Sequence, residues 1–260
     1  MEKICNELLA LVHIMERLRG KDGCPWDKKQ TPDTVKEYLL EEAYEVVDAV
    51  EKKDSKALCE ELGDLFFQII FLSHLAKEKG EFSLLDVFRL IKEKMIRRHP
   101  HVFGDVKVKD AEEVLKNWAR IKEKEKKGSE KHPLEDIPLC LPALLRAQKL
   151  SEKAARFGFD WKDKKGIWEK VKEEFRELEE AIESEDKERV KEEIGDLLFS
   201  IVNLSRHWKL NAEQILREAN RKFVERFKKM EEELKKRGLS LESATLEQMD
   251  SVWEKIKKDV

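Results

Sequence analysis

Four acidic residues in the first half of the chain have the types and the spacing that could hold a metal ion. Glu42 and Glu45 are three residues apart, and so are Glu61 and Asp64. Residues three apart share one face of a helix, so each pair predicts two carboxylates that point the same way. If the two helices pack side by side, all four carboxylates converge.

Acids on a helix are most often part of a solvated surface, especially in a chain that is 42% charged. Two observations argue against that interpretation. The apolar stretch LFFQIIFL directly follows Asp64, so we expect this helix to be central and its acids to be partly desolvated. No basic side chain stands at the helical spacing needed to neutralise all four acids, and unpaired buried carboxylates are costly. A bound cation is therefore favoured.

The same acids return later in the chain at a constant shift of 132 residues. Residues 41–74 align with residues 173–206 without a gap, and 15 of these 34 positions are identical. The charged positions in residues 52–59 and 184–191 differ, apart from Asp54 and Asp186. Repetition that retains the acids and changes their neighbours indicates two copies of one functional unit. The acids of the second copy are Glu173, Glu174, Glu177, Glu193 and Asp196, which match Glu41, Glu42, Glu45, Glu61 and Asp64.

A donor set made only of carboxylate oxygens favours a hard cation, Mg²⁺ or Mn²⁺, over zinc or copper. A di-iron bundle usually has Glu-x-x-His on its helices, and neither copy has that motif. Magnesium held on one side by protein often binds substrate phosphates on the other, so basic side chains should accompany it. The candidates are Arg97 and Arg98 in the first copy, with Lys222 and Arg226 in the second.

Each of these bases, taken alone, is typical of an ordinary protein surface. Two tryptophans, Trp118 and Trp253, recur at a shift of 135. They could flank a nucleobase, although tryptophans at such positions more often pack in a core.

The elements that must position these residues are helices. The chain has 260 residues with only 10 glycines and 6 prolines, which favours an all-α fold. Apolar spacing and cap residues predict one helix after Thr31 and another over about 57–79, joined as an antiparallel hairpin by the turn KKDSKA. We expect an N-terminal domain at 1–125, a linker at 126–142 and a C-terminal domain at 143–260.

Composition limits the partners and the compartment. The net charge is only −3 and the charges are evenly mixed, so no nucleic-acid partner is expected. The four cysteines are scattered and form no C-x-x-C pair, which is typical of reduced thiols. No apolar run approaches the roughly 20 residues that span a bilayer, and the N-terminus is unlike a signal peptide. We expect a cytoplasmic protein without membrane contact.

Together these motifs resemble a known family. GCPWDKKQT, EEAYE, EELGDLFFQ and RRHPHVFGD in the first half, and GFDW, EEFRE, EEIGDLLF and ANRKFVERF in the second, resemble the MazG nucleoside triphosphate pyrophosphohydrolases. The similarity covers nearly the whole chain in the same order of motifs. It implies two tandem MazG-like helical domains with four-helix-bundle cores formed through a homodimer. It also implies Mg²⁺-dependent hydrolysis of nucleoside triphosphates to nucleoside monophosphates and pyrophosphate.

The resemblance also assigns roles to residues, and it implies broad base specificity with a part in nucleotide-pool housekeeping or alarmone-related control. The general base is expected among Glu41, Glu42, Glu173 and Glu174. The metal ligands are expected to be Glu42, Glu45, Glu61, Asp64, Glu174, Glu177, Glu193 and Asp196. The substrate-binding residues are expected to be Arg97, Arg98, Trp118, Lys222, Arg226 and Trp253.

Two alternatives stay open from the sequence. One is a related all-α pyrophosphohydrolase specific for dUTP or for a phosphoribosyl-nucleotide. The other is a non-enzymatic helical interaction module. Both copies keep every acid, so we expect both to bind metal, and the sequence leaves open which copy is the more active.

Overall fold

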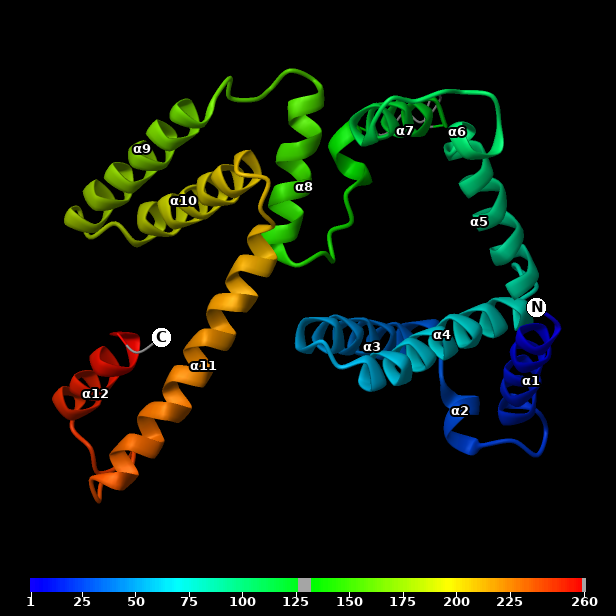
Figure 1. Ribbon diagram of the computed structural model, residues 1–260, viewed down its shortest axis with the longest axis horizontal. Coiled ribbons are helices and arrows are strands. Elements are labelled where there is room, and N and C mark those ends of the chain that lie inside the picture. Colours follow the sequence, from blue (N-terminus) through cyan, green and yellow to red (C-terminus); the bar gives the residue numbers. More distant parts are fainter. Residues whose placement is uncertain (126–131, 259–260) are drawn as a thin grey trace. The chain divides into compact units, whose positions relative to one another are not determined.

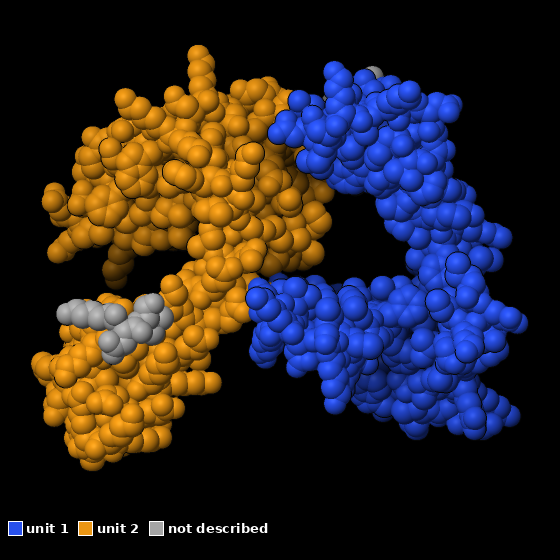
Figure 2. Space-filling view, in the orientation of Figure 1, with its two compact units in different colours: residues 1–128 blue, residues 129–260 orange. Residues whose placement is uncertain are grey.

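The structure is a computed structural model that describes residues 1–125 and 132–258. Every regular element in these ranges is a helix, as the composition predicts (Figure 1). The chain divides into two compact units, residues 1–128 and residues 129–260 (Figure 2). Part of the expected linker, residues 126–131, lies outside the described residues. The domain boundaries expected from the sequence therefore stay a prediction.

Each unit has its own series of helices. Unit 1 contains α1 (Glu2–Arg19), α2 (Pro25–Lys29), α3 (Pro32–Lys52), α4 (Ser55–Glu78), α5 (Leu84–Arg98), α6 (Pro100–Phe103) and α7 (Ala111–Glu125). Unit 2 contains the 3₁₀ helix η1 (Pro133–Asp136), then α8 (Ala143–Arg156), α9 (Lys164–Glu183), α10 (Lys187–His207), α11 (Ala212–Lys236) and α12 (Leu246–Lys258).

The predicted hairpin is present in both units, as α3 with α4 and as α9 with α10 (Figure 1). The two turns are built alike. Lys53 and Glu185 adopt the left-handed conformation, with φ of 56° and 53°. The next residue is an aspartate whose side chain caps the following helix, accepting from two backbone N–H groups in each case. This explains why Asp54 and Asp186 match while the other charged positions in the turn differ.

The core of unit 1 lies where α1 packs on the second half of α4. Met15, Ile70, Phe71 and Leu75 are buried there, together with Val35 of α3. The first half of α4, which carries the acids, is not enclosed: Leu62 is 49% exposed. The expectation of a central helix is therefore met only beyond Gln68.

Unit 2 has two groups of buried residues. Ile167, Val171 and Ala181 of α9 are buried, as is Val202 of α10. A separate cluster joins α11 to α12 through Met230, Leu234 and Val252. In contrast, three apolar residues of α10 at helical spacing are about half exposed, and these are Ile194, Leu198 and Ile201. This hairpin thus presents an apolar face that the described residues of its unit leave uncovered.

Candidate active sites

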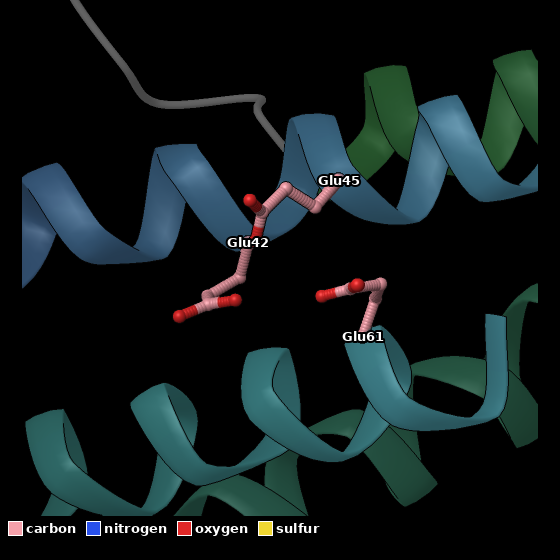
Figure 3. Close-up of side chains that lie close together, drawn as sticks. All are labelled: Glu42, Glu45 and Glu61. Atoms are coloured by element: carbon pink, nitrogen blue, oxygen red, sulfur yellow. The ribbon is translucent and has the colours of Figure 1, made fainter. Parts of the chain in front are cut away.

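The first cluster lies between α3 and α4 of unit 1. Glu42 and Glu45 come from α3 and Glu61 comes from α4, and each offers a carboxylate oxygen within 4.8 Å of the others. Figure 3 shows Glu42 and Glu61 directed into the space between the two helices, and Glu45 running along α3 toward Glu42. The spacing of three residues on α3 and the antiparallel hairpin produce this convergence. We call Glu42, Glu45 and Glu61 the N-terminal cluster.

No basic side chain among the described residues balances the negative charge of the N-terminal cluster. Burial raises the pKa of Glu42, and the charges of Asp64 and Glu45 raise it further. Burial also raises the pKa of Glu61, again with added repulsion from Glu45 and Asp64. The nearest polar partner is neutral, since Gln68 Nε2 donates to Glu42 Oε1 at 3.4 Å. None of the three cluster carboxylates forms an ion pair within the described part of the chain.

Two acids predicted for this site lie at its margin. Asp64 is exposed and outside the group of oxygens that lie within 4.8 Å, although its charge acts on both Glu42 and Glu61. Glu41 is also exposed and outside that group, because it lies on α3 beside Glu42 and is rotated by about 100° around the helix.

The second cluster is built in the same way from α9 and α10. Glu174 and Glu177 of α9 meet Glu193 of α10, with oxygens within 4.8 Å of one another. Glu174 is buried, and burial followed by the charges of Glu174 and Glu193 raises the pKa of Glu177. Asp196 is exposed at the margin, as Asp64 is. We call Glu174, Glu177 and Glu193 the C-terminal cluster.

The two clusters differ in their counterions. Lys170 Nζ lies 2.9 Å from Glu174 and 2.7 Å from Glu173, and these bonds raise the pKa of Lys170. Arg189 is 3.8 Å from Glu193. The expectation that no cation stands at helical spacing therefore holds for the N-terminal cluster and is wrong in part for the C-terminal one. The matching residues in unit 1 are Tyr38 and Ala57, which carry no charge to pair.

The predicted basic and aromatic residues of unit 1 do come together, at the junction of α5 with α7. Arg98 stacks on Trp118, with its guanidinium carbon 5.1 Å from the ring centroid. Both Arg97 and Arg98 form ion pairs with Glu125, a residue that the sequence reasoning missed. Glu125 is 27 residues from Arg98, so no local pattern could have indicated the contact.

In unit 2 the corresponding residues lie on α11 and α12. Trp253 packs against Phe223, with ring centroids 5.3 Å apart, so it is partly a core residue. Lys222 is exposed, and Arg226 is half-buried. The Nε atom of Arg226 is buried and makes no hydrogen bond among the described residues.

The basic groups do not reach the acidic clusters of their own unit. Within the described residues, α7 packs only on α5, and α12 packs only on α11. Arg97 and Arg98 end a helix of 15 residues, so they lie about 20 Å from the α4–α5 junction. Glu61 lies about 25 Å from that junction along α4. One unit thus carries both halves of the expected site, but at separate places.

The donor set of each cluster fits a divalent cation. Carboxylate oxygens are the preferred ligands of Mg²⁺, and small rotations bring oxygens within 4.8 Å onto one ion. The raised pKa values of Glu42, Glu61 and Glu177 report excess negative charge that such an ion relieves. Glu42, Glu45 and Glu61 would hold an ion in unit 1, and Glu174, Glu177 and Glu193 would hold one in unit 2.

Comparison with known proteins gives a consistent result. The family model described as the MazG nucleotide pyrophosphohydrolase domain matches residues 30–103 and again residues 163–231, so it includes both clusters. A Thermotoga maritima protein named nucleoside triphosphate pyrophosphohydrolase/pyrophosphatase MazG is 48% identical over 95% of this chain and 94% of its own. An Escherichia coli nucleoside triphosphate pyrophosphohydrolase is 44% identical over 97% of this chain and 98% of its own. Bacillus subtilis YabN, named as uncharacterized, is 46% identical over 97% of this chain and 52% of its own.

Proposed function

The chain belongs to the MazG family and is a nucleoside triphosphate pyrophosphohydrolase, and we propose that its two carboxylate clusters hold the Mg²⁺ on which that activity depends. The observation that supports this proposal is the convergence of three carboxylates in each unit on the same helical hairpin. Mn²⁺ has similar preferences and is expected to substitute. Family membership sets aside the non-enzymatic interaction module.

The residues divide the chemical work between them. When bound, Mg²⁺ would act as a Lewis acid that polarises the phosphate groups of the substrate. Either Glu41 or Glu42 in unit 1, and Glu173 or Glu174 in unit 2, orients the attacking water and accepts its proton. Asp64 and Asp196 complete the ligand sets from the margins of the clusters.

The basic and aromatic residues bind the rest of the nucleotide. Arginine forks match the oxygens of a phosphate chain, and a neighbouring indole offers a face for a base. We assign this role to Arg97, Arg98 and Trp118 in unit 1 and to Lys222, Arg226 and Trp253 in unit 2. Because a flat indole contact does not distinguish bases, broad base specificity is part of the proposal. So is a role in nucleotide-pool housekeeping or alarmone-related control.

We further propose that the protein acts as a homodimer. The acids and the bases of one unit lie apart, so a second copy can bring the bases of one chain to the acids of another. The exposed apolar residues Ile194, Leu198 and Ile201 offer a face for that contact. No described helix is long and apolar enough to cross a membrane. A cytoplasmic location is also proposed, since none of the four cysteines is in a disulfide.

A thermal melt with and without Mg²⁺ tests the metal proposal directly. A ligand that binds the folded state raises the melting temperature by mass action. We expect Mg²⁺ to raise it for the parent chain, and much less for the double variant Glu42→Gln plus Glu174→Gln. Equal shifts in both proteins would contradict the assignment of the clusters. A panel of nucleotides with pyrophosphate detection then separates a broad enzyme from one specific for dUTP or a phosphoribosyl-nucleotide.

A further inference from the structure

In unit 1, an acidic side chain is bound to the two arginines at the end of α5. Arg97 Nε donates to Glu125 Oε1 at 2.7 Å, while Arg98 donates to Glu125 Oε2 from Nε at 3.1 Å and from Nη2 at 2.5 Å. Arg98 Nε also lies 3.4 Å from Glu125 Oε1, so two arginines hold one carboxylate through four charged hydrogen bonds. This is the arrangement that arginine forks also make with a phosphate group.

The same group contains the surface expected to hold a base. The Arg98 guanidinium lies over Trp118, and the Lys122 ammonium is 5.4 Å from the same ring centroid. We call Arg97, Arg98, Trp118 and Lys122 the basic–aromatic cluster. Two cations lie over this indole, and Arg97 adds a third positive charge at the carboxylate of Glu125. Glu125 is the anion that fills this site in the structure.

The second unit shows that these residues do not need an acid in order to fold. Arg226 and Trp253 match Arg98 and Trp118 at the shifts of 128 and 135. Arg226 makes no ion pair with any residue that the structure describes, and its Nε atom is buried without a hydrogen bond. There α12 is held on α11 by apolar packing of Met230, Leu234 and Val252. Among the described residues, only unit 1 has an acid paired with this arginine.

We propose that Glu125 is an internal competitor for substrate phosphate, so that a nucleotide must displace its carboxylate from Arg97 and Arg98 before it can bind in unit 1. The inference rests on the proposed function, because it takes the basic–aromatic cluster as the phosphate site. It makes unit 1 a site whose hold on phosphate is weakened by its own acid.

Displacement by an anion is physically feasible here. Arg97 is 54% exposed, so a phosphate group can approach from solvent. The side chains of Arg98 and Glu125 are only 13% and 20% exposed, so the phosphate group reaches the pair through Arg97. Protonation does not open the site, because Arg98 and Arg97 hold the pKa of Glu125 at about 2. Only a competing anion frees the two arginines at neutral pH.

Calorimetric titration of the full chain with inorganic tripolyphosphate, without divalent metal, tests the proposal. Without metal, tripolyphosphate binds to the basic side chains and not to the carboxylate clusters. All proteins carry Lys222→Ala and Arg226→Ala, so that unit 2 does not contribute. We expect Glu125→Gln to raise the affinity about fivefold or more. Glu112→Gln, which makes the same change of charge at an exposed position of α7, should change it less than about twofold.

Three outcomes would overturn the proposal. These are an unchanged affinity in Glu125→Gln, an equal gain in Glu112→Gln, and a gain that survives when Arg98→Ala is added to Glu125→Gln. If Glu125→Gln melts too low for titration, Glu125→Asp is the second variant. It keeps the charge but is too short to span both guanidinium groups, so we expect a smaller gain, and no gain would contradict the idea. Because no turnover is measured, failure here leaves the proposed reaction untouched, and a wrong reaction product leaves this result standing.

Discussion

At the scale of single residues, the carboxylates of each cluster repel one another in the folded protein. Glu42 and Glu61 have pKa values above that of an ordinary glutamate because burial and neighbouring carboxylates oppose their ionisation. A carboxyl group with a raised pKa binds more protons in the folded state than in the unfolded state. The free energy of unfolding therefore falls as the pH rises from the unfolded-state pKa to the folded-state pKa. Above the folded-state pKa the destabilisation is complete.

Removing one of these charges should therefore stabilise the metal-free protein. We expect Glu61→Gln to raise the melting temperature at pH 7. The effect should be small near pH 4, because a glutamate carboxyl with the ordinary pKa of 4.5 is largely protonated there, and a raised pKa favours protonation further. With Mg²⁺ added, the parent chain should have the higher melting temperature, because it then binds a ligand that the variant binds poorly. Glu37→Gln, at an exposed position of α3, is the control. A lower melting temperature for metal-free Glu61→Gln at pH 7 would show that repulsion among the cluster carboxylates does not destabilise the protein.

Residues were predictable from sequence where their contacts are local or repeated. The acids of both clusters were found because their spacing recurs at a shift of 132. Lys170 was missed although the sequence contained its signal, a lysine three and four residues before Glu173 and Glu174. Glu125 could not be found, because its partners are 27 and 28 residues away and a tertiary contact brings them together.

At the scale of elements, helix position and the turn chemistry were largely predictable. The expected second helix over about 57–79 is observed as Ser55–Glu78, and the difference at its start comes from the capping side chain of Asp54. Burial was less predictable. The apolar stretch after Asp64 suggested a helix surrounded by its own unit, but the half that carries the acids is open to solvent. The spacing of apolar residues shows which face of a helix is apolar, but it does not show what covers that face.

Glycines at the same place in both hairpins give a test at this scale. A Cβ atom added at Gly63 or Gly195 would meet no described atom within 4 Å, so neither glycine is explained by crowding inside the chain. Gly63→Ala should stabilise the isolated chain by about 1 kcal/mol through helix propensity, as chemical denaturation can measure. Gly63→Leu should keep the helical circular dichroism but lower activity, because a substrate or second copy approaches there. Full activity in Gly63→Leu would show that nothing comes close to this position.

At the scale of the whole molecule, uncovered apolar faces indicate assembly. Unit 1 exposes Leu40, Tyr44 and Val47 on one side of α3, and unit 2 exposes Ile194, Leu198 and Ile201 on α10. The helical spacing of each set makes a continuous stripe, which is typical of a protein–protein interface. The homodimer was expected only from the family resemblance, because periodicity does not distinguish a face buried by its own chain from one buried by another.

Charge placed on such a stripe should weaken the dimer. We expect the parent chain to sediment as a dimer and Leu198→Lys to shift it toward monomer while the helical content is retained, because the lysine ammonium must lose its hydration at the interface. Leu210→Lys replaces a similarly exposed leucine that lies between α10 and α11, and it should leave the assembly unchanged. A parent chain that sediments as a monomer at micromolar concentration would contradict the proposed homodimer.

The central claim is that the two carboxylate clusters carry the Mg²⁺-dependent release of pyrophosphate. Phosphorus NMR of ATP incubated with the protein and Mg²⁺ tests it most directly, because it identifies every product. The parent chain should yield AMP and pyrophosphate, and the double variant Glu42→Gln plus Glu174→Gln should be slower by about 100-fold or more with unchanged helical content. ADP and orthophosphate as products, or undiminished turnover in the double variant, would contradict the account.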